Sequence, residues 1–299
     1  MDACCAMALD FYVFLRCQTN INRMDNTRTA WNADELKARF NPEGSLLRRQ
    51  QLVMLDMVNE LDRICRKYDI PYFLYGGTLL GAIRHNGFIP WDDDLDVGLM
   101  RKDYQRLMRV LPDELPPHII LQTNQTDRNY FYFFAKLRDT RSFLDEGAYD
   151  RAFNYRGIFI DIFPFDKLQL PLQQLKLQSY AYTLYRNGNG SEAALRKIRA
   201  LTWFNRNISF PVLRAISRLT GGKTLTYDFG IPFHIVYDEK DIFPLSTHEF
   251  EGIQLSVPGD SDHMLRSQFG DYMRLPNLDN VEHHVVTLEF FDDKTEATD

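Results

Sequence analysis

Residues 75–100, which read YGGTLLGAIRHNGFIPWDDDLDVGLM, constrain the fold of this chain more than any other segment. The glycine pair Gly76-Gly77 opens a short segment, 78–85, that predicts a helix. Asp94 and Asp96 then begin an apolar run that predicts a strand ending near Met100. A helix that starts at glycines and a strand that starts at acids are therefore expected to lie next to each other.

The two carboxylates of that strand indicate a metal site. Asp94 and Asp96 point the same way on a strand, because successive side chains alternate between its faces. Two carboxylates a few ångströms apart resist joint ionisation, and a bound Mg²⁺ or Mn²⁺ removes that conflict. Gly76, Gly77 and Thr78 would let a phosphate approach the backbone N–H groups at the helix start. The pattern predicts metal-dependent phosphoryl or nucleotidyl transfer.

The acids allow other interpretations when they are taken alone. Asp92-Asp93-Asp94 is also typical of a charged turn after Pro90, and an Asp-x-Asp pattern occurs in glycosyltransferases that hold a nucleotide sugar. Trp91 and the apolar residues around Asp96 favour a site, because a charge at the edge of apolar structure is costly without a partner. Whether Asp92 or Asp93 also binds metal stays open.

A third acid interrupts another apolar run. Residues 157–164 read GIFIDIFP and predict a strand that is covered on both faces. Asp161 shares a face with Phe159 and Phe163, so its carboxylate needs a cation, a set of hydrogen bonds or a raised pKa. We expect Asp161 to complete the metal shell or to accept a proton, with a structural polar network as the alternative.

Several motifs together resemble the LicD family. They are GTLLGAIRHNGFIPWDDDLDVG, FAKLRDT, GIFIDIFPFD, FEG, VP and FGDYMRLP, and the similarity runs from about residue 46 to 284. The family belongs to the nucleotidyltransferase-fold superfamily and is similar to fukutin-type catalytic domains. The resemblance implies transfer of a phospho-substituent, typically phosphocholine from CDP-choline, to a cell-surface glycan. It also implies divalent metal between acids that match Asp94, Asp96 and Asp161.

Composition and cysteine usage limit the class of protein. The chain has 299 residues, 44% of them hydrophobic, and a net charge of −6, which fits a packed enzyme and argues against a nucleic-acid binder. Its four cysteines show neither zinc spacing nor a disulfide framework, so reduced thiols and a cytoplasmic location are expected. Residues 1–30 are expected to be a loosely ordered extension, and 289–299 a frayed acidic tail.

The periodic segments predict an α+β domain over 31–288. We expect a mixed sheet that is flanked by helices, with a helical subdomain at about 170–222, and the resemblance implies that this sheet is nucleotidyltransferase-like. Phe250-Glu251-Gly252 and Phe269-Gly270-Asp271-Tyr272 are candidate loops over the site. Helices are predicted over 47–68, 78–85, 103–111, 172–186 and 191–219, and strands over 72–75, 119–122, 130–138 and 157–163.

Further positive charge is expected near a diphosphate donor. Arg84 and His85 are candidates, with a cation-favouring helix C-terminus as the alternative. Lys136 and Arg138 share one strand face, and we expect at least one of them to contact phosphate. Tyr272 can stack on a base or a choline, as can Trp91, although a core position suits Trp91 better.

Two further features leave their roles open. His283 or His284 is a candidate phosphate or acceptor contact. The helical subdomain is rich in Arg and Lys, which fits either a solvated helix face or contact with an anionic glycan or the inner face of the membrane. The sequence thus favours a CDP-linked donor and a glycan or glycolipid acceptor. Alternatives are a glycosyltransferase that uses a nucleotide sugar and a non-catalytic glycan-binding relative. The oligomeric state is open.

Overall fold

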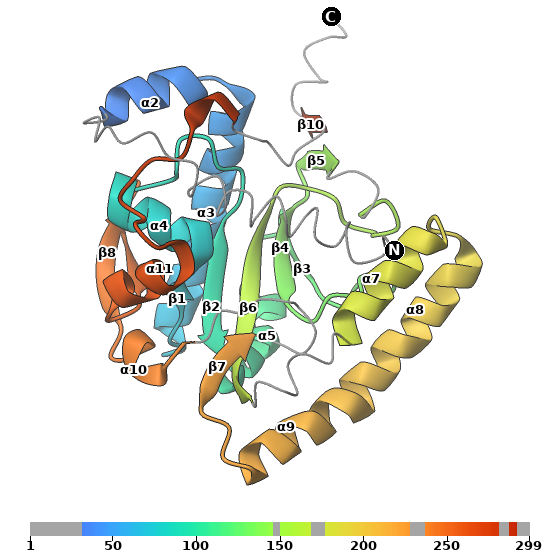
Figure 1. Ribbon diagram of the computed structural model, residues 1–299. Helices are drawn as coiled ribbons and strands as arrows, with labels where there is room; N and C mark the ends of the chain where they lie inside the picture. Colours follow the sequence, from blue (N-terminus) through green and yellow to red (C-terminus); the bar gives the residue numbers. More distant parts are fainter. Residues whose placement is uncertain (1–31, 146–149, 169–176, 228–236, 281–286, 292–299) are drawn as a thin grey trace, which may run out of the picture.

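The computed structural model describes residues 32–145, 150–168, 177–227, 237–280 and 287–291 (Figure 1). The expected N-terminal extension, His283, His284 and most of the acidic tail lie outside the described residues.

A mixed sheet forms the centre of the molecule, as expected for an α+β protein. Its strand order is β1-β2-β6-β4-β3, and β7 also pairs with β6. β2 and β6 run parallel, whereas β1–β2, β4–β6, β3–β4 and β6–β7 are antiparallel. The strands are β1 (Phe73–Leu74), β2 (Asp96–Met100), β3 (Ile119–Gln122), β4 (Ala135–Asp139), β6 (Phe159–Leu168) and β7 (Thr224–Tyr227).

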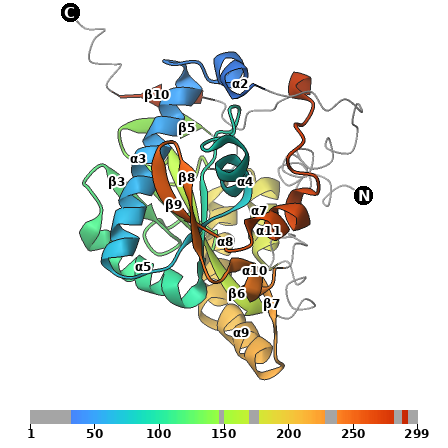
Figure 2. The same cartoon turned by 90° about the vertical axis from the view of Figure 1, so that its left-hand side faces the viewer.

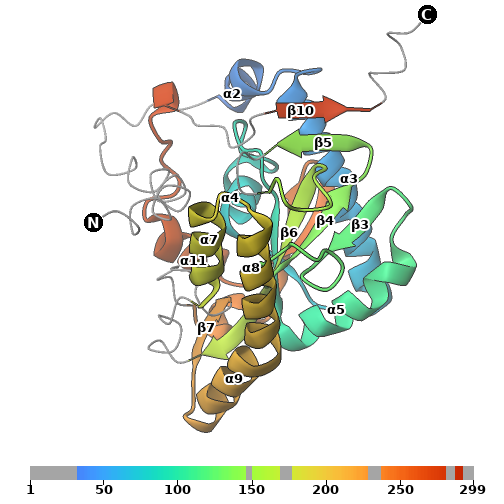
Figure 3. The same ribbon diagram turned by 90° about the vertical axis from the view of Figure 1, so that its right-hand side faces the viewer.

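Helices cover both faces of this sheet. α3 (Leu46–Lys67) and α5 (Arg101–Glu114) lie on one face, and the apolar side of α3 is buried there (Figures 1 and 2). α7 (Leu177–Asn187) and α8 (Glu192–Phe204) lie on the other face (Figure 3). The sheet is thus enclosed, which explains why β6 is apolar on both of its sides.

The segments around the glycine pair follow the sequence closely. α3 begins after Ser45, whose side chain accepts a hydrogen bond from the Arg48 N–H group and caps the helix. α4 (Gly76–His85) begins two residues earlier than the pattern predicts, because it includes the glycine pair, and Gly76 enters the helix with a φ of +59° that favours glycine. Asn86 follows in the left-handed conformation and ends α4.

Residues 130–134 differ from the predicted strand 130–138, because β4 begins only at Ala135. Tyr130 and Phe131 pack instead against Phe153 and against side chains of α7 and α8, in an aromatic cluster beside the sheet. These residues are stabilised by burial of their rings and not by hydrogen bonds to a neighbouring strand. The alternation of side chains along the sequence does not distinguish a strand from such a cluster.

The predicted helical segment at 191–219 is one helical rod with a local change of pitch (Figure 3). α8 continues into a π-helical turn at Asn205–Ser209 and then into α9 (Phe210–Leu219), and the backbone stays helical at both joints. Among the described residues, no helix combines the length and the apolarity that crossing a bilayer requires.

Smaller elements complete the fold. The hairpin of β8 (Ser246–Phe250) and β9 (Ile253–Val257) carries Glu251 at its turn, where the motif FEG predicts a loop. Tyr272 lies just after α11, in the predicted loop that starts at Phe269. The small elements are α2 (Ala33–Phe40), β5 (Ser142–Asp145), α10 (Glu239–Ile242), β8 (Ser246–Phe250), β9 (Ile253–Val257), α11 (Ser261–Phe269), the 3₁₀ turn Leu278–Asn280 and β10 (Thr287–Phe290).

Candidate active site

The parallel pairing of β2 and β6 brings two of the predicted acids together. Asp96 and Asp161 are direct partners in the register of these strands. The N–H group of Asp161 donates to the carbonyl oxygen of Leu95 at 2.8 Å, which fixes the entry of the chain into β2. Two carboxylates on adjacent central strands are thereby held side by side at the edge of the apolar core.

The first turn of α4 lies directly against these acids. The N–H group of Asp96 donates to Thr78 Oγ1 at 2.8 Å, and the N–H group of Tyr75 donates to the Asp96 carbonyl oxygen at 3.1 Å. A Cβ at Gly76 would lie 3.0 Å from Asp96 Oδ2, and one at Gly77 would lie 2.9 Å from an Asp92 oxygen. The glycine pair therefore lets carboxylates approach the start of the helix, where its dipole favours negative charge.

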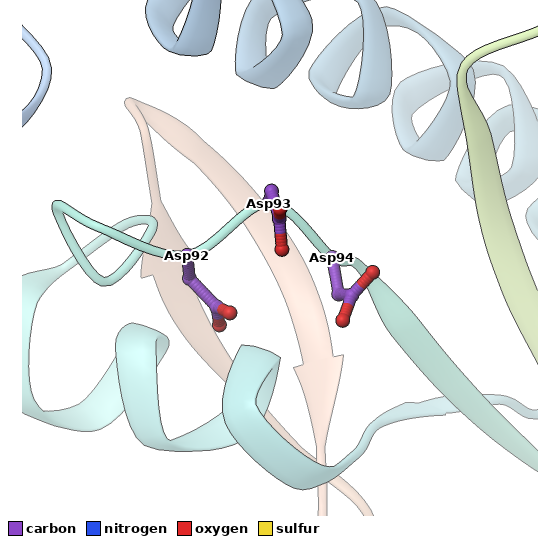
Figure 4. A group of neighbouring side chains, drawn as sticks. All are labelled: Asp92, Asp93 and Asp94. Carbon is purple, nitrogen blue, oxygen red and sulfur yellow. The ribbon is translucent and has the colours of Figure 1, made fainter. Parts of the chain in front are cut away.

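Asp94 lies in the loop before β2, because the strand begins only at Asp96. Asp92, Asp93 and Asp94 can each offer one oxygen, and these oxygens lie within 4.8 Å of one another. The carboxylates of Asp92 and Asp94 point toward α4 (Figure 4). The structure thus adds Asp92 to the acids that face the helix start.

Two buried glutamines hold this acidic loop in place. Gln50 Nε2 donates to the carbonyl oxygen of Asp93 at 2.8 Å, and Gln51 Nε2 donates to that of Asp92 at 2.9 Å. Asn41 in turn donates to Gln51 Oε1 at 2.7 Å. Side chains of α3 therefore fix the backbone of the acidic loop, which suits a site that must keep its geometry.

The electrostatics of the site centre on Asp96. Burial, and then the charges of Asp161, Asp94 and Asp92, raise the pKa of the Asp96 carboxyl well above its usual range, against the opposing effect of Lys136. Four acids and one ammonium thus lie around the start of β2. A carboxyl in such surroundings ionises readily only when further positive charge arrives.

The donor set fits a divalent cation of the hard type. All of the candidate ligands are carboxylate oxygens, which Mg²⁺ and Mn²⁺ accept, and no softer ligand is found among the described side chains of this cluster. Repulsion from the neighbouring carboxylates helps to raise the pKa of Asp96, and such a cation would offset this repulsion. Asp94, Asp96 and Asp161 remain the predicted ligands, with Asp92 beside them.

Lys136 and Arg138 have different surroundings although they share a face of β4. Lys136 Nζ lies 2.9 Å from Asp161 Oδ1 and also lies over the ring of Phe159. Arg138 is fully buried, and its guanidinium donates to Gln122 and to the carbonyl oxygen of Gly157. The structure thus brings Lys136 to the acids and encloses Arg138 in the core.

Arg84 and His85 lie at the other end of α4. Arg84 donates to the carbonyl oxygens of Tyr272 and Arg274, at 2.7 and 3.3 Å, and to His85 Nε2 at 2.9 Å. Burial, together with the charges of Arg84 and Lys37, lowers the pKa of His85 to about 3. The pair therefore joins α4 to the segment after α11, with a neutral imidazole as acceptor.

The aromatic candidates are both buried. Trp91 packs edge-on against Phe40, with ring centroids 5.2 Å apart, which confirms its predicted core position. The Tyr272 hydroxyl donates to Asp262 at 2.8 Å. Burial and that carboxylate raise the pKa of Tyr272 to about 12, so the phenol stays protonated and continues to donate.

Some positioning residues have only a weak signal in the sequence. Gln50 and Gln51 are polar side chains on the buried part of α3, and their position within an otherwise apolar face is that signal. Glu251 accepts hydrogen bonds from Arg48 at 2.9 Å and from the Phe88 N–H group at 3.3 Å. The FEG turn therefore supports the loop that leads to the acids.

Comparisons with known proteins agree with these motifs. Residues 69–212 match the family described as LicD/FKTN/FKRP, nucleotidyltransferase domain. The chain is 31% identical over 259 residues to a lipopolysaccharide cholinephosphotransferase, LicD, of Haemophilus influenzae, and this covers 80% of the chain and 96% of that relative. It is 53% identical over 34 residues to the ribitol 5-phosphate transferase FKRP of Mus musculus and of Homo sapiens, which covers 11% of the chain and 7% of each relative.

Proposed function

The chain belongs to the LicD family and is a LicD-like phosphotransferase, and from this premise we propose that it transfers phosphocholine or a similar phospho-substituent from a CDP-linked donor to a hydroxyl group of a cell-surface glycan. The observation that carries the proposal is the pairing of Asp96 with Asp161 across β2 and β6, with two further acids that raise the pKa of Asp96. Such a surplus of carboxylates suits a cation that also binds a diphosphate.

Asp94, Asp96 and Asp161 would hold Mg²⁺ or Mn²⁺, with Asp92 as a further oxygen donor. When bound, the ion supplies neutralisation of the diphosphate and of the leaving nucleotide. The start of α4 fixes the position of Asp96, and so the place where the ion would bind. The Asp96 N–H group donates to Thr78 Oγ1, and the Tyr75 N–H group donates to the Asp96 carbonyl oxygen.

The remaining polar groups would bind and orient the donor. Helical geometry gives the N–H groups of Gly76, Gly77 and Thr78 no partner within α4, and α4 has no side-chain cap. These groups suit one phosphate, and Lys136 on the opposite side of Asp161 suits a second. Arg84 and Tyr272 would contribute indirectly, since their described hydrogen bonds join the far end of α4 to the segment after α11.

Transfer breaks the bond between the bridging oxygen of the diphosphate and the phosphorus that carries the transferred group. A new bond forms between that phosphorus and the acceptor oxygen, and CMP leaves with the electron pair. The acceptor hydroxyl loses its proton, and Asp161, whose Oδ1 lies 2.9 Å from Lys136 Nζ, would either accept that proton or complete the metal shell.

We place this activity in the cytoplasm, at the inner face of the membrane. A CDP-linked donor and cysteines without a disulfide framework both fit that compartment. The acceptor would be a glycan or a glycolipid that is still accessible there.

The test is turnover of a donor panel by purified protein with Mn²⁺. CDP-choline, CDP-ethanolamine, CDP-ribitol and UDP-glucose would each be followed by the nucleotide that is released. We expect CMP from a CDP-linked donor, no release without metal, and loss of release in Asp96→Asn. Asp103→Asn is the matched control, because that carboxylate lies on α5 and pairs with Arg106. UDP release alone would favour a glycosyltransferase, and folded protein without any turnover would favour a non-catalytic relative.

A further inference from the structure

The long helix of the helical subdomain exposes an apolar stripe. Six of the large apolar side chains that are exposed in the described part of the chain lie on it, and Leu219 at its end is 87% exposed. Phe204, Ile208, Val212 and Ile216 recur every four residues and so form a row on one side of the rod. Together with Trp203 and Leu219 they are called the apolar stripe below.

Packing among the described residues does not account for this stripe. The same helix already buries another face, where Leu195 and Ile198 join the aromatic cluster beside the sheet. Further along, Phe210 packs on Phe133 with ring centroids 4.4 Å apart. The helix is therefore apolar on two sides, and the residues that the structure describes cover only one of them. Figure 3 shows the rod on the outside of the molecule.

The charge of this region is opposite to that of the whole chain. Residues 186–223 contain eight Lys and Arg residues and a single acid, Glu192, whereas the chain carries a net charge of −6. Arg199 pairs with Glu192, and Arg214 pairs with Asp166. The exposed cations that remain on the same rod or just beyond it are Arg196, Lys197, Arg218 and Lys223.

We propose that the apolar stripe of the helix at 192–219 docks on an anionic lipid bilayer. Exposed apolar side chains between cations are the pattern of helices that lie in a membrane interface, where Trp also accumulates. The cations would face anionic headgroups while the stripe enters the boundary of the acyl chains. A second copy of the chain suits this surface less well, because a twofold interface would bring the same cations of both copies together.

The test uses the whole chain and vesicles of two compositions. Vesicles of phosphatidylcholine alone are compared with vesicles of equal parts phosphatidylcholine and phosphatidylglycerol, and the bound fraction is measured by flotation at low and high salt. We expect binding to the anionic vesicles that weakens with salt. Brominated lipid should quench the fluorescence of Trp203, and Trp203→Phe should still bind while losing that quenching.

Matched variants distinguish vesicle binding through the apolar stripe from nonspecific binding of the protein to vesicles. Val212→Asp combined with Ile216→Asp should lower the vesicle partition coefficient roughly tenfold or more. Arg218→Glu combined with Lys223→Glu should lower it about tenfold, for anionic vesicles only. Leu52→Asp is the control, because Leu52 is an exposed apolar side chain on α3. All of these variants change exposed side chains, and circular dichroism checks that they remain folded.

Several results would overturn the proposal. One is binding that the stripe variants leave unchanged, and another is quenching that persists in Trp203→Phe, since a different surface would then touch the lipid. A third is a concentration-dependent dimer that Ile216→Asp abolishes, in protein that does not bind vesicles. Release of CMP from a soluble donor should be unchanged in the stripe variants, so the docking surface and the proposed activity can fail independently.

Discussion

Two carboxylates on the same strand, the half-buried Asp161 and the buried Asp166, have contrasting surroundings. Asp166, near the end of β6, lies 2.7 Å from Arg101 Nε and 2.8 Å from Arg214 Nε. Asp161, five residues earlier, has one ammonium at 2.9 Å and faces Asp96 on the neighbouring strand. One acid is surrounded by cations, and the other lies among acids.

This contrast distinguishes a structural acid from an acid kept for a ligand. Burying a carboxylate is costly, and two guanidinium groups offset that cost at Asp166. Around Asp96 the neighbouring charges have the opposite sign and raise its pKa. Folding alone does not select such a cluster, so we infer that a cation in the functional state stabilises it.

Asp96→Asn should reduce turnover of the CDP-linked donor about 10³-fold, because it removes a ligand and a charge at the centre of the site. The same change relieves repulsion between neighbouring, half-buried acids, so the free energy of unfolding should stay the same or rise. Steady-state kinetics and urea unfolding measure the two quantities. An inactive variant that is also strongly destabilised would assign Asp96 to the structure rather than to the site.

Asp166→Asn should show the reverse pattern. It leaves two guanidinium groups in a largely buried place without their carboxylate, which should cost about 3 kcal/mol of unfolding free energy. Turnover per folded molecule should change little, because Asp166 lies at the other end of β6. Urea unfolding and activity corrected for the folded fraction check this. Stability equal to that of the original protein would remove the contrast between the two acids.

His85, at the far end of α4, is a structural residue whose pKa is also shifted by burial and by neighbouring charges. Its folded pKa of about 3 lies below the usual value, so acidification protonates the unfolded chain first and destabilises the fold. The stability that His85 contributes is fully present above about pH 6.5, and about 2 kcal/mol should be lost at pH 5. His85→Gln cannot titrate and should flatten the slope of unfolding free energy between these pH values. An unchanged slope would show that other groups cause it.

Gly76→Ala should lower the free energy of unfolding by about 1 kcal/mol, because Gly76 has a positive φ. Its added methyl group would also press on Asp96 Oδ2 and should lower turnover about tenfold. Gly221→Ala is the matched control, since Gly221 has a similar φ and open space around it. Equal turnover in both variants would mean that the close approach of Gly76 to Asp96 has no role in catalysis.

The sequence predicts the components of the site better than their arrangement. The run GIFIDIFP indicates a covered strand with an acid inside it, and β6 confirms this. The glycine pair and the helix after it are confirmed by α4. Both signals are local, since they depend on side-chain alternation and on backbone freedom within a few residues.

The contacts between segments that are distant in the sequence could not be predicted from local patterns. The parallel register of Asp96 with Asp161 depends on how β2 and β6 pair, which no periodicity encodes. Alternation places Lys136 and Arg138 on one face, but only the packed structure encloses Arg138 against Gln122 and leaves Lys136 beside Asp161. The role of the buried Gln50 and Gln51 side chains could likewise not be predicted, because it depends on the packing of α3 against the acidic loop.

The most direct test of the central inference is a Mn²⁺ titration followed by electron paramagnetic resonance, with CDP-choline present. The original protein and Asp166→Asn should both bind Mn²⁺ saturably, because the two guanidinium groups around Asp166 already neutralise that acid. Asp96→Asn should lose this binding while it remains folded. Equal Mn²⁺ binding by the original protein and by Asp96→Asn would contradict the assignment of the carboxylate cluster to a divalent cation.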